Sequence, residues 1–173
     1  MRHLVALALL AAPATAQEFG PIHDVLSHPR CANCHVDAEG IPLWSTEEGG
    51  TIPHGMNVRG GESRMGIETL PCATCHGHEN NPLPGGAPGE EGWALAPVEM
   101  QWAARSAREI CEQLKDPERN GGRTLAEVAE HVGHDPLVLW GWEPGPGREP
   151  APGTPEAAEE AILAWAEAGA PCP

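Results

Sequence analysis

The chain of 173 residues contains no tyrosine and one phenylalanine, so it lacks the aromatic side chains that fill many protein cores. Glycine and proline are abundant instead, at 21 and 19 residues. This composition is typical of loops and of disordered segments. The alternative is a folded domain whose core comes partly from a bound apolar group.

Basic residues are also scarce, with ten Lys and Arg against 25 Asp and Glu, which gives a formal net charge of −15. Nucleic acid is excluded as a partner on this ground, because such binding depends on neutralising phosphates with Lys and Arg. The acidic surface favours association with a basic patch on a partner protein. Plain solubility is the other explanation for this charge.

Long apolar runs are missing except at the N-terminus, where residues 4–12 (LVALALLAA) follow a short basic start. The small residues Ala14-Thr15-Ala16 then form an A-x-A cleavage site. A membrane anchor would need about 20 apolar residues, and Pro13 ends this run earlier. The sequence therefore predicts a signal peptide over residues 1–16, a mature chain without an integral membrane segment, and a periplasmic location.

Two C-x-x-C-H motifs carry the clearest chemical signal in the chain. They are Cys31-Ala-Asn-Cys34-His35 and Cys72-Ala-Thr-Cys75-His76, and this pattern is the attachment motif of c-type haem. Two thiols three positions apart reach the two vinyl groups of one haem, and the next residue supplies the proximal histidine for the iron. We therefore expect two haem c groups, held by Cys31 and Cys34 and by Cys72 and Cys75, with His35 and His76 on the irons.

Three other interpretations of the motifs agree less well with the sequence. A thiol–disulfide redox motif is usually found in a thioredoxin-like βαβ context, which this sequence does not show. A zinc site would combine the two Cys pairs, but their spacing exceeds the usual range of a zinc ribbon. A chance origin does not account for two copies in a chain that carries an export signal.

The distal iron ligands are open on sequence grounds. His54 lies in a loop between the motifs, and His131 lies near the end of an expected helix, so we predict these two. His28, His134 and Met100 are the alternatives. A Met ligand would raise the redox potential relative to His, and an iron without a sixth ligand would indicate peroxide or ligand chemistry.

Cys111 and Cys172 remain after the haem motifs are assigned. An oxidising compartment predicts a disulfide between them. Closing the long loop between Cys111 and Cys172 would stabilise the fold by roughly 4 kcal/mol on the chain-entropy model. A reactive thiol is the functional alternative.

The chain is expected to form one dihaem cytochrome c-like domain over residues 17–173, mainly α with extensive loops and little or no β-sheet. Residues 17–92 form the loop-rich, haem-attaching half, which opens with a short approach segment at 18–29. Residues 93–173 form the helical half. Its expected helices lie at 97–115, at 124–131 after the capping box of Thr124 and Glu127, and from Pro155 to a stop at Gly169. Asp135 and Pro136 are expected to cap a short turn through residues 137–139.

Several segments resemble a family of exported dihaem proteins named as subunits of isoquinoline 1-oxidoreductase, a molybdenum hydroxylase. These segments are 28–35, 70–76, 109–123, 134–142 and 164–172, and the resemblance spans nearly all of the mature chain. It implies a cytochrome subunit that accepts electrons from a molybdenum and iron–sulfur dehydrogenase. The sequence contains no fingerprint for those cofactors itself.

Three functions follow as hypotheses. The first is an electron-transfer protein without catalytic activity of its own, in which each iron keeps two protein ligands. The second is a haem enzyme, such as a small peroxidase with one open iron. The third is a haem sensor or a binding module for a periplasmic partner, for which no signalling segment is present.

Overall fold

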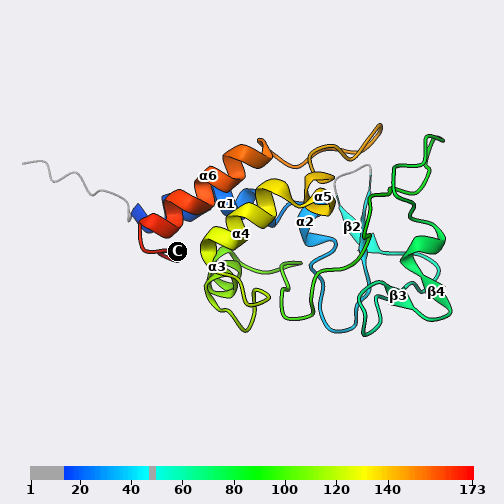
Figure 1. The fold of residues 1–173 in the computed structure, drawn as a ribbon, viewed down its shortest axis with the longest axis horizontal. Helices are drawn as coiled ribbons and strands as arrows, with labels where there is room; N and C mark the ends of the chain where they lie inside the picture. Colours follow the sequence, from blue (N-terminus) through cyan, green and yellow to red (C-terminus); the bar gives the residue numbers. More distant parts are fainter. Residues whose placement is uncertain (1–13, 47–49) are drawn as a thin grey trace, which may run out of the picture.

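The computed structural model describes residues 14–46 and 50–173 (Figure 1). The apolar run of the predicted signal peptide lies outside these residues. The helices are α1 (Ala14–Leu26), α2 (Pro29–Ala32), α3 (Ala107–Lys115), α4 (Leu125–His134), α5 (Pro136–Leu139) and α6 (Pro155–Glu167), with a 3₁₀ turn at Cys72–Thr74. The strands are β1 (Leu43–Ser45), β2 (Thr51–Pro53), β3 (Gly66–Ile67) and β4 (Leu70–Pro71). The fold is mainly helical with little sheet, as the sequence predicts.

A helical core occupies one end of the molecule (Figure 1), where α6 packs against α1 and α4 and where α1 contacts α3. Phe19 and Trp165 meet at its centre, with ring centroids 5.2 Å apart. The most deeply buried aliphatic side chains around them come from α1, α3 and α6, where Ile22, Leu26, Ile110, Leu114 and Ile162 are each at most 2% exposed. Helix α4 adds Val128, Ala129 and Val132, which are each at most 4% exposed. Because these residues exclude water from every helix interface, the helices stabilise one another.

Helix α1 corrects one expectation, since residues 18–29 were predicted to be a short approach segment. Phe19, Ile22 and Leu26 are spaced for one helical face and all three are buried. Gly20 and Pro21 interrupt this face in the sequence, but the apolar side of the helix still packs on α6 and α3. Tertiary packing therefore outweighs the local composition here.

The predicted helices at 124–131 and 155–168 are confirmed, the short turn predicted after Asp135 is the one-turn helix α5, and each begins at the expected cap. Thr124 and Glu127 form a reciprocal capping box at α4, Asp135 caps α5 and Thr154 caps α6. The orphan N–H groups of the first turns are satisfied in this way. Helix α4 continues to His134, so both predicted ligand positions on it, 131 and 134, lie in its last turn.

The helix predicted at 97–115 is wrong in its first half, because α3 starts only at Ala107. Ser106 and Glu109 form a capping box that fixes this start. Before α3, the backbone forms hydrogen bonds outside any helix: the N–H groups of Trp102 and Ala103 donate to the carbonyl of His35, over 2.9 and 3.1 Å. Residues 97–106 therefore form a loop that lies against the first motif.

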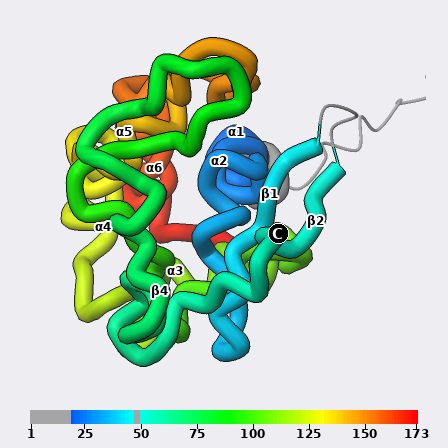
Figure 2. The backbone as a smooth tube through the Cα atoms, turned by 90° about the vertical axis from the view of Figure 1, so that its right-hand side faces the viewer, coloured from blue at the N-terminus to red at the C-terminus, as the bar shows by residue number. Residues whose placement is uncertain are grey.

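The other end of the molecule consists of loops with two small antiparallel hairpins. β1 pairs with β2 and β3 with β4. In Figure 2 the β1–β2 hairpin lies beside α2, and the N–H of Leu43 donates to the carbonyl of Asn33 over 3.0 Å. The first hairpin is thus attached directly to the first C-x-x-C-H segment.

The predicted disulfide between Cys111 and Cys172 is confirmed, with the two Cα atoms 5.7 Å apart. It joins α3 to the C-terminal residues after α6. Trp165 adds a second attachment, because its Nε1 donates to the carbonyl of Pro171 over 2.9 Å. The C-terminus is therefore fixed to the helical core.

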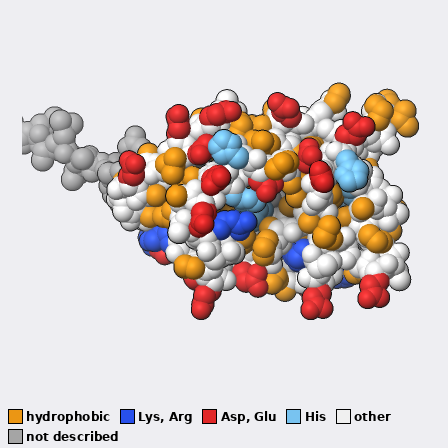
Figure 3. Space-filling view, viewed as in Figure 1, with side chains coloured by type: hydrophobic (Ala, Val, Ile, Leu, Met, Phe, Trp, Pro, Cys, Tyr) orange, Lys and Arg blue, Asp and Glu red, His pale blue; other side chains and the backbone are white. Residues whose placement is uncertain are grey.

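Acidic side chains are spread over the face shown in Figure 3, where basic side chains are few. Within the described ranges, no helix combines the length and the apolar character needed to cross a bilayer.

Candidate haem-attachment sites

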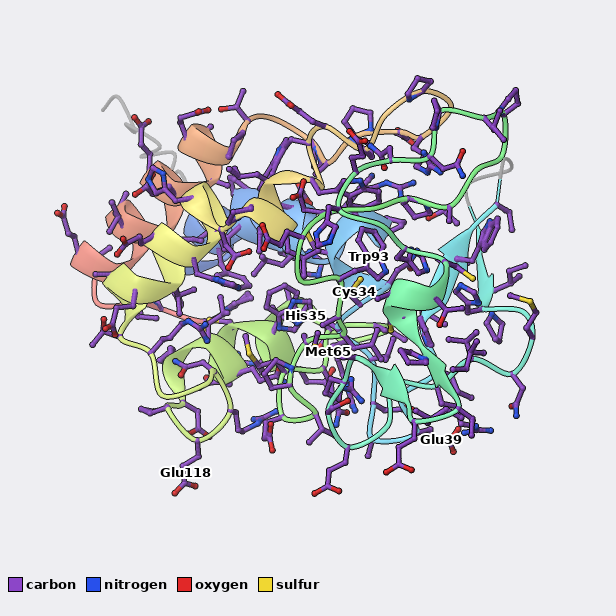
Figure 4. All side chains as sticks on the ribbon, turned by 45° about the vertical axis from the view of Figure 1, so that its right-hand side comes forward. Cys34, His35, Glu39, Met65, Trp93 and Glu118 are labelled. Atoms are coloured by element: carbon purple, nitrogen blue, oxygen red, sulfur yellow. A yellow bond between two sulfur atoms is a disulfide. The ribbon has the colours of Figure 1, made fainter. Side chains whose placement is uncertain are left out.

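The first motif lies on and just after α2. Asn33 caps the C-terminal end of this short helix, and the N–H groups of Cys34 and His35 both donate to the carbonyl of Cys31. One helical turn therefore separates Cys31 from Cys34 and His35, which places these side chains on neighbouring positions of one face. In Figure 4, Cys34 and His35 lie in the middle of the molecule, between the helices and the hairpins.

The ring of His35 is held from two sides. Its Nδ1 lies 3.0 Å from the carbonyl oxygen of Met100. The indole of Trp102 stacks on the imidazole, with ring centroids 3.4 Å apart and an interplanar angle of 3°. Burial lowers the pKa of His35 to about 3, so the ring is neutral at physiological pH.

The second motif repeats this arrangement on an unrelated piece of chain. Cys72 starts a 3₁₀ turn, and the N–H groups of Cys75 and His76 donate to its carbonyl over 3.1 and 3.0 Å. The Nδ1 of His76 lies 2.8 Å from the carbonyl oxygen of Pro88. Trp93 stacks on this imidazole, with ring centroids 4.7 Å apart and an interplanar angle of 7°, and burial lowers the pKa of His76.

These contacts determine the tautomer of both rings. A backbone carbonyl only accepts hydrogen bonds, so Nδ1 must carry the proton in His35 and in His76. The Nε2 lone pair of each neutral ring is then free to bind a metal. A carbonyl on the other ring nitrogen is the usual support of a metal-binding histidine.

The four motif cysteines are free thiols. Burial raises the pKa of Cys31 to about 12 and that of Cys34 to about 11, and the nearby Cys72 contributes to the second shift. Activated C-x-x-C oxidoreductases have the opposite property, a lowered thiol pKa. The structure therefore gives no support to a disulfide exchange site.

The zinc alternative is not supported either. Across residues 14–46 and 50–173, no group of three or more Cys, His, Asp or Glu side chains is arranged to hold a metal ion. A structural zinc site needs four such ligands in a tetrahedron. The two Cys pairs are close to each other through Cys34 and Cys72, but they do not converge on a shared centre.

Of the two predicted distal ligands, His54 lies beside the second motif. Its ring centroid is 6.2 Å from that of His76, with an interplanar angle of 62°. The Nδ1 of His54 lies 3.0 Å from the carbonyl oxygen of Gly55, so its Nε2 also has a free lone pair. Trp44 of β1 contacts the other side of the ring, with centroids 5.9 Å apart.

His131 lies near the first motif, close enough that a charge on it would lower the pKa of His35. Its Nδ1 is 3.3 Å from Oδ2 of Asp135, one turn further along the chain. This carboxylate orients the ring and places the proton on Nδ1, as in carboxylate–histidine–metal arrangements. Burial lowers the pKa of His131 despite the carboxylate.

The three alternatives are arranged differently. The Nδ1 of His28 accepts a hydrogen bond from the N–H of Arg30 over 3.2 Å, so the proton of the neutral ring is on Nε2. The Nε2 of His134 lies 3.1 Å from a carboxylate oxygen of Glu159. Met100 is 4% exposed and belongs to the helical core, and its carbonyl contacts His35 on the proximal side.

The loop-rich end contains two small hairpins but few buried side chains. Within residues 37–46 and 50–94, no hydrophobic side chain is buried. Large apolar side chains in this region are exposed instead: Trp44, Ile52, Met56, Met65, Ile67 and Leu83. A bound apolar group of the size of a porphyrin fits this distribution.

One polar atom also fits a bound group. The indole Nε1 of Trp102 is buried and has no hydrogen-bond partner in the described part of the chain. Buried donors are nearly always satisfied, so an acceptor on a group bound beside His35 would complete this site.

No model of a protein family, no curated protein and no solved structure matches this chain.

Sequence reasoning missed several residues that build the sites. The sequence has no feature that pairs Trp93 or Trp102 with a particular histidine. Arg64 was not singled out, yet its guanidinium lies near His35. The support of His131 by Asp135 was detectable, since an i, i+4 spacing on a helix brings two side chains together.

Proposed function

We propose that this protein is an exported dihaem c-type cytochrome that transfers electrons. One observation carries the proposal: in both C-x-x-C-H segments the histidine Nδ1 is held by a backbone carbonyl, which leaves Nε2 free beside two free thiols. Such duplicated geometry on two unrelated segments is what two covalent haem sites require.

Each residue of a site has a separate task. The thiols of Cys31 and Cys34, and those of Cys72 and Cys75, would form the thioethers. His35 and His76 would bind the irons, while Trp102 and Trp93 restrict the rotation of their rings. The haem supplies an iron that alternates between the ferric and ferrous states. Because a carbonyl and a tryptophan hold each histidine ring, little reorganisation of these side chains would be needed when an iron changes its oxidation state.

The closeness of the two motifs supports transfer between the haems. The thiol of Cys72 is near enough to influence the pKa of Cys34, although 41 residues separate Cys31 from Cys72 in the sequence. One compact domain would therefore hold both haems close together. Electrons would enter at one haem and leave from the other.

The partner and the compartment follow from the sequence. The predicted signal peptide places the mature protein in the periplasm. The resemblance to isoquinoline 1-oxidoreductase subunits implies a molybdenum and iron–sulfur dehydrogenase as electron donor. The net charge of −15 would favour a basic docking patch on that partner.

The test is the haem content of exported protein made in a host with a functioning haem-attachment system. We expect two covalently bound haems per chain by mass and by absorption of the pyridine haemochrome. The double variant Cys31→Ala/Cys34→Ala should lose one haem, and Cys72→Ala/Cys75→Ala should lose the other.

The matched control removes two cysteines elsewhere. Cys111→Ala/Cys172→Ala should keep both haems, because these residues form the structural disulfide. Colourless exported protein, or two haems per chain retained in either motif variant, would refute the proposal.

A further inference from the structure

We propose that the iron held by His76 takes His54 as its second histidine ligand. This inference rests on the proposed function, and it assigns the sixth ligand of one haem. It also closes that iron to exogenous ligands, which separates an electron carrier from a peroxidase with an open iron at this site.

The distance between the His54 and His76 rings is the observation that supports this ligand pair. Metal–imidazole bonds are about 2 Å long, so two imidazoles on opposite sides of one metal ion have ring centres about 6 Å apart. The observed separation is 6.2 Å. Neither histidine contacts the other through a hydrogen bond, and the Nδ1 of each is occupied by a carbonyl oxygen. The two free lone pairs are therefore both on Nε2.

The chain around His54 keeps this ring in place. The N–H of His54 donates to the carbonyl of Pro42 over 2.8 Å, just beyond the pairing of Leu43 with Pro53 in the β1–β2 hairpin. The hairpin is in turn bonded to Asn33 of the first motif. His54 is thus positioned by a rigid element although it lies outside regular structure.

The experiment measures the spin state of each haem by paramagnetic resonance and magnetic circular dichroism in purified full-length protein. In the wild type the haem attached at Cys72 and Cys75 should be low-spin in the ferric state. His54→Ala should convert this haem to high spin, while the covalent haem content stays at two per chain.

The pairing is tested by combining variants. In a protein that lacks the second haem through Cys72→Ala/Cys75→Ala, the change His54→Ala should have no effect on the spectrum of the remaining haem. In a protein that lacks the first haem through Cys31→Ala/Cys34→Ala, the same change should convert the remaining haem to high spin. His54→Met should restore a low-spin iron and raise its midpoint potential, because a thioether favours ferrous iron.

The control is His134→Ala, which removes a histidine that contacts Glu159 and should leave the spectra unchanged. A haem at Cys72 and Cys75 that stays low-spin in His54→Ala would overturn the ligand assignment while leaving the dihaem proposal intact. A high-spin haem at this site in the wild type would likewise overturn it and would favour the peroxidase. Loss of haem from the wild type would instead refute the proposed function.

Discussion

Arg64 lies beside the first attachment motif and donates three hydrogen bonds to backbone carbonyls. Its acceptors are Ala96 at 2.7 Å, Val36 at 3.1 Å and Asp37 at 3.2 Å. The guanidinium forms no salt bridge in the described part of the chain, in a protein with a large excess of acidic residues. It therefore joins the chain after Cys34 to the segment before Met100, and it places a positive charge near His35.

The variant Arg64→Gln should lower the midpoint potential of the haem bound to His35. A nearby positive charge disfavours the ferric state, so its removal stabilises that state, by roughly tens of millivolts. Redox titration monitored by absorption measures this shift. Arg105→Gln is the control, because Arg105 forms a surface pair with Glu109 and should leave both potentials unchanged. An unchanged potential in Arg64→Gln would show that the charge does not act on the iron.

At the scale of elements, capped helix ends decide where the helical half begins and ends. The hydroxyl of Thr124 accepts from the N–H of Glu127, and the Glu127 carboxylate accepts from the N–H and the hydroxyl of Thr124. These hydrogen bonds lower the pKa of Glu127. Ser106 and Glu109 form the same arrangement at α3. Helices α3 and α4 therefore both begin at a capping box.

The variant Thr124→Ala should reduce the free energy of unfolding by about 1 kcal/mol at neutral pH, since the cap of α4 is lost. Thr124→Ser is the matched control and should retain most of the stability. Denaturant unfolding of the purified protein measures both.

The cost of Thr124→Ala should become smaller in acid. The folded state lowers the pKa of Glu127 below its ordinary value of 4.5. The stabilisation is therefore complete above pH 4.5 and is lost as the pH falls through the lowered folded-state pKa. A difference between the two proteins that did not decrease in acid would contradict a charged capping box.

At the scale of the whole molecule, the two ends differ in what holds them together. The helical end has a buried core and a disulfide. The end with the hairpins has exposed apolar side chains and, in residues 37–46 and 50–94, no buried hydrophobic one. Its stability should therefore depend on the haems, whereas that of the helices should not.

Removing all four motif cysteines, as the Cys31→Ala/Cys34→Ala/Cys72→Ala/Cys75→Ala variant, should separate the two ends in hydrogen exchange. We expect amides of residues 37–94 to lose protection, since the apolar group that covers their side chains is absent. Amides of α3, α4 and α6 should remain protected, because the buried side chains of these helices pack mainly on one another and on α1. Uniform loss along the chain would show that the helical end also needs haem, and full protection would show that neither end does.

The sequence alone is enough to predict the features that depend on near neighbours in the chain. The capping residues of α4, α5 and α6 stand within three positions of the groups they bind. Each C-x-x-C-H segment turns within itself, so its side chains converge whatever surrounds them. The pairing of Cys111 with Cys172 followed by elimination, once the other cysteines were assigned to haem.

Only the tertiary structure could decide which distant groups meet. Residues 97–106 are not helical because their N–H groups bind the carbonyl of His35, and α1 is helical because α6 covers its apolar face. The carbonyls of Met100 and Pro88 set the tautomers of His35 and His76, and the β1–β2 hairpin brings His54 to His76. These contacts join residues that are far apart in the chain, and their free energy depends on packing that no local pattern encodes.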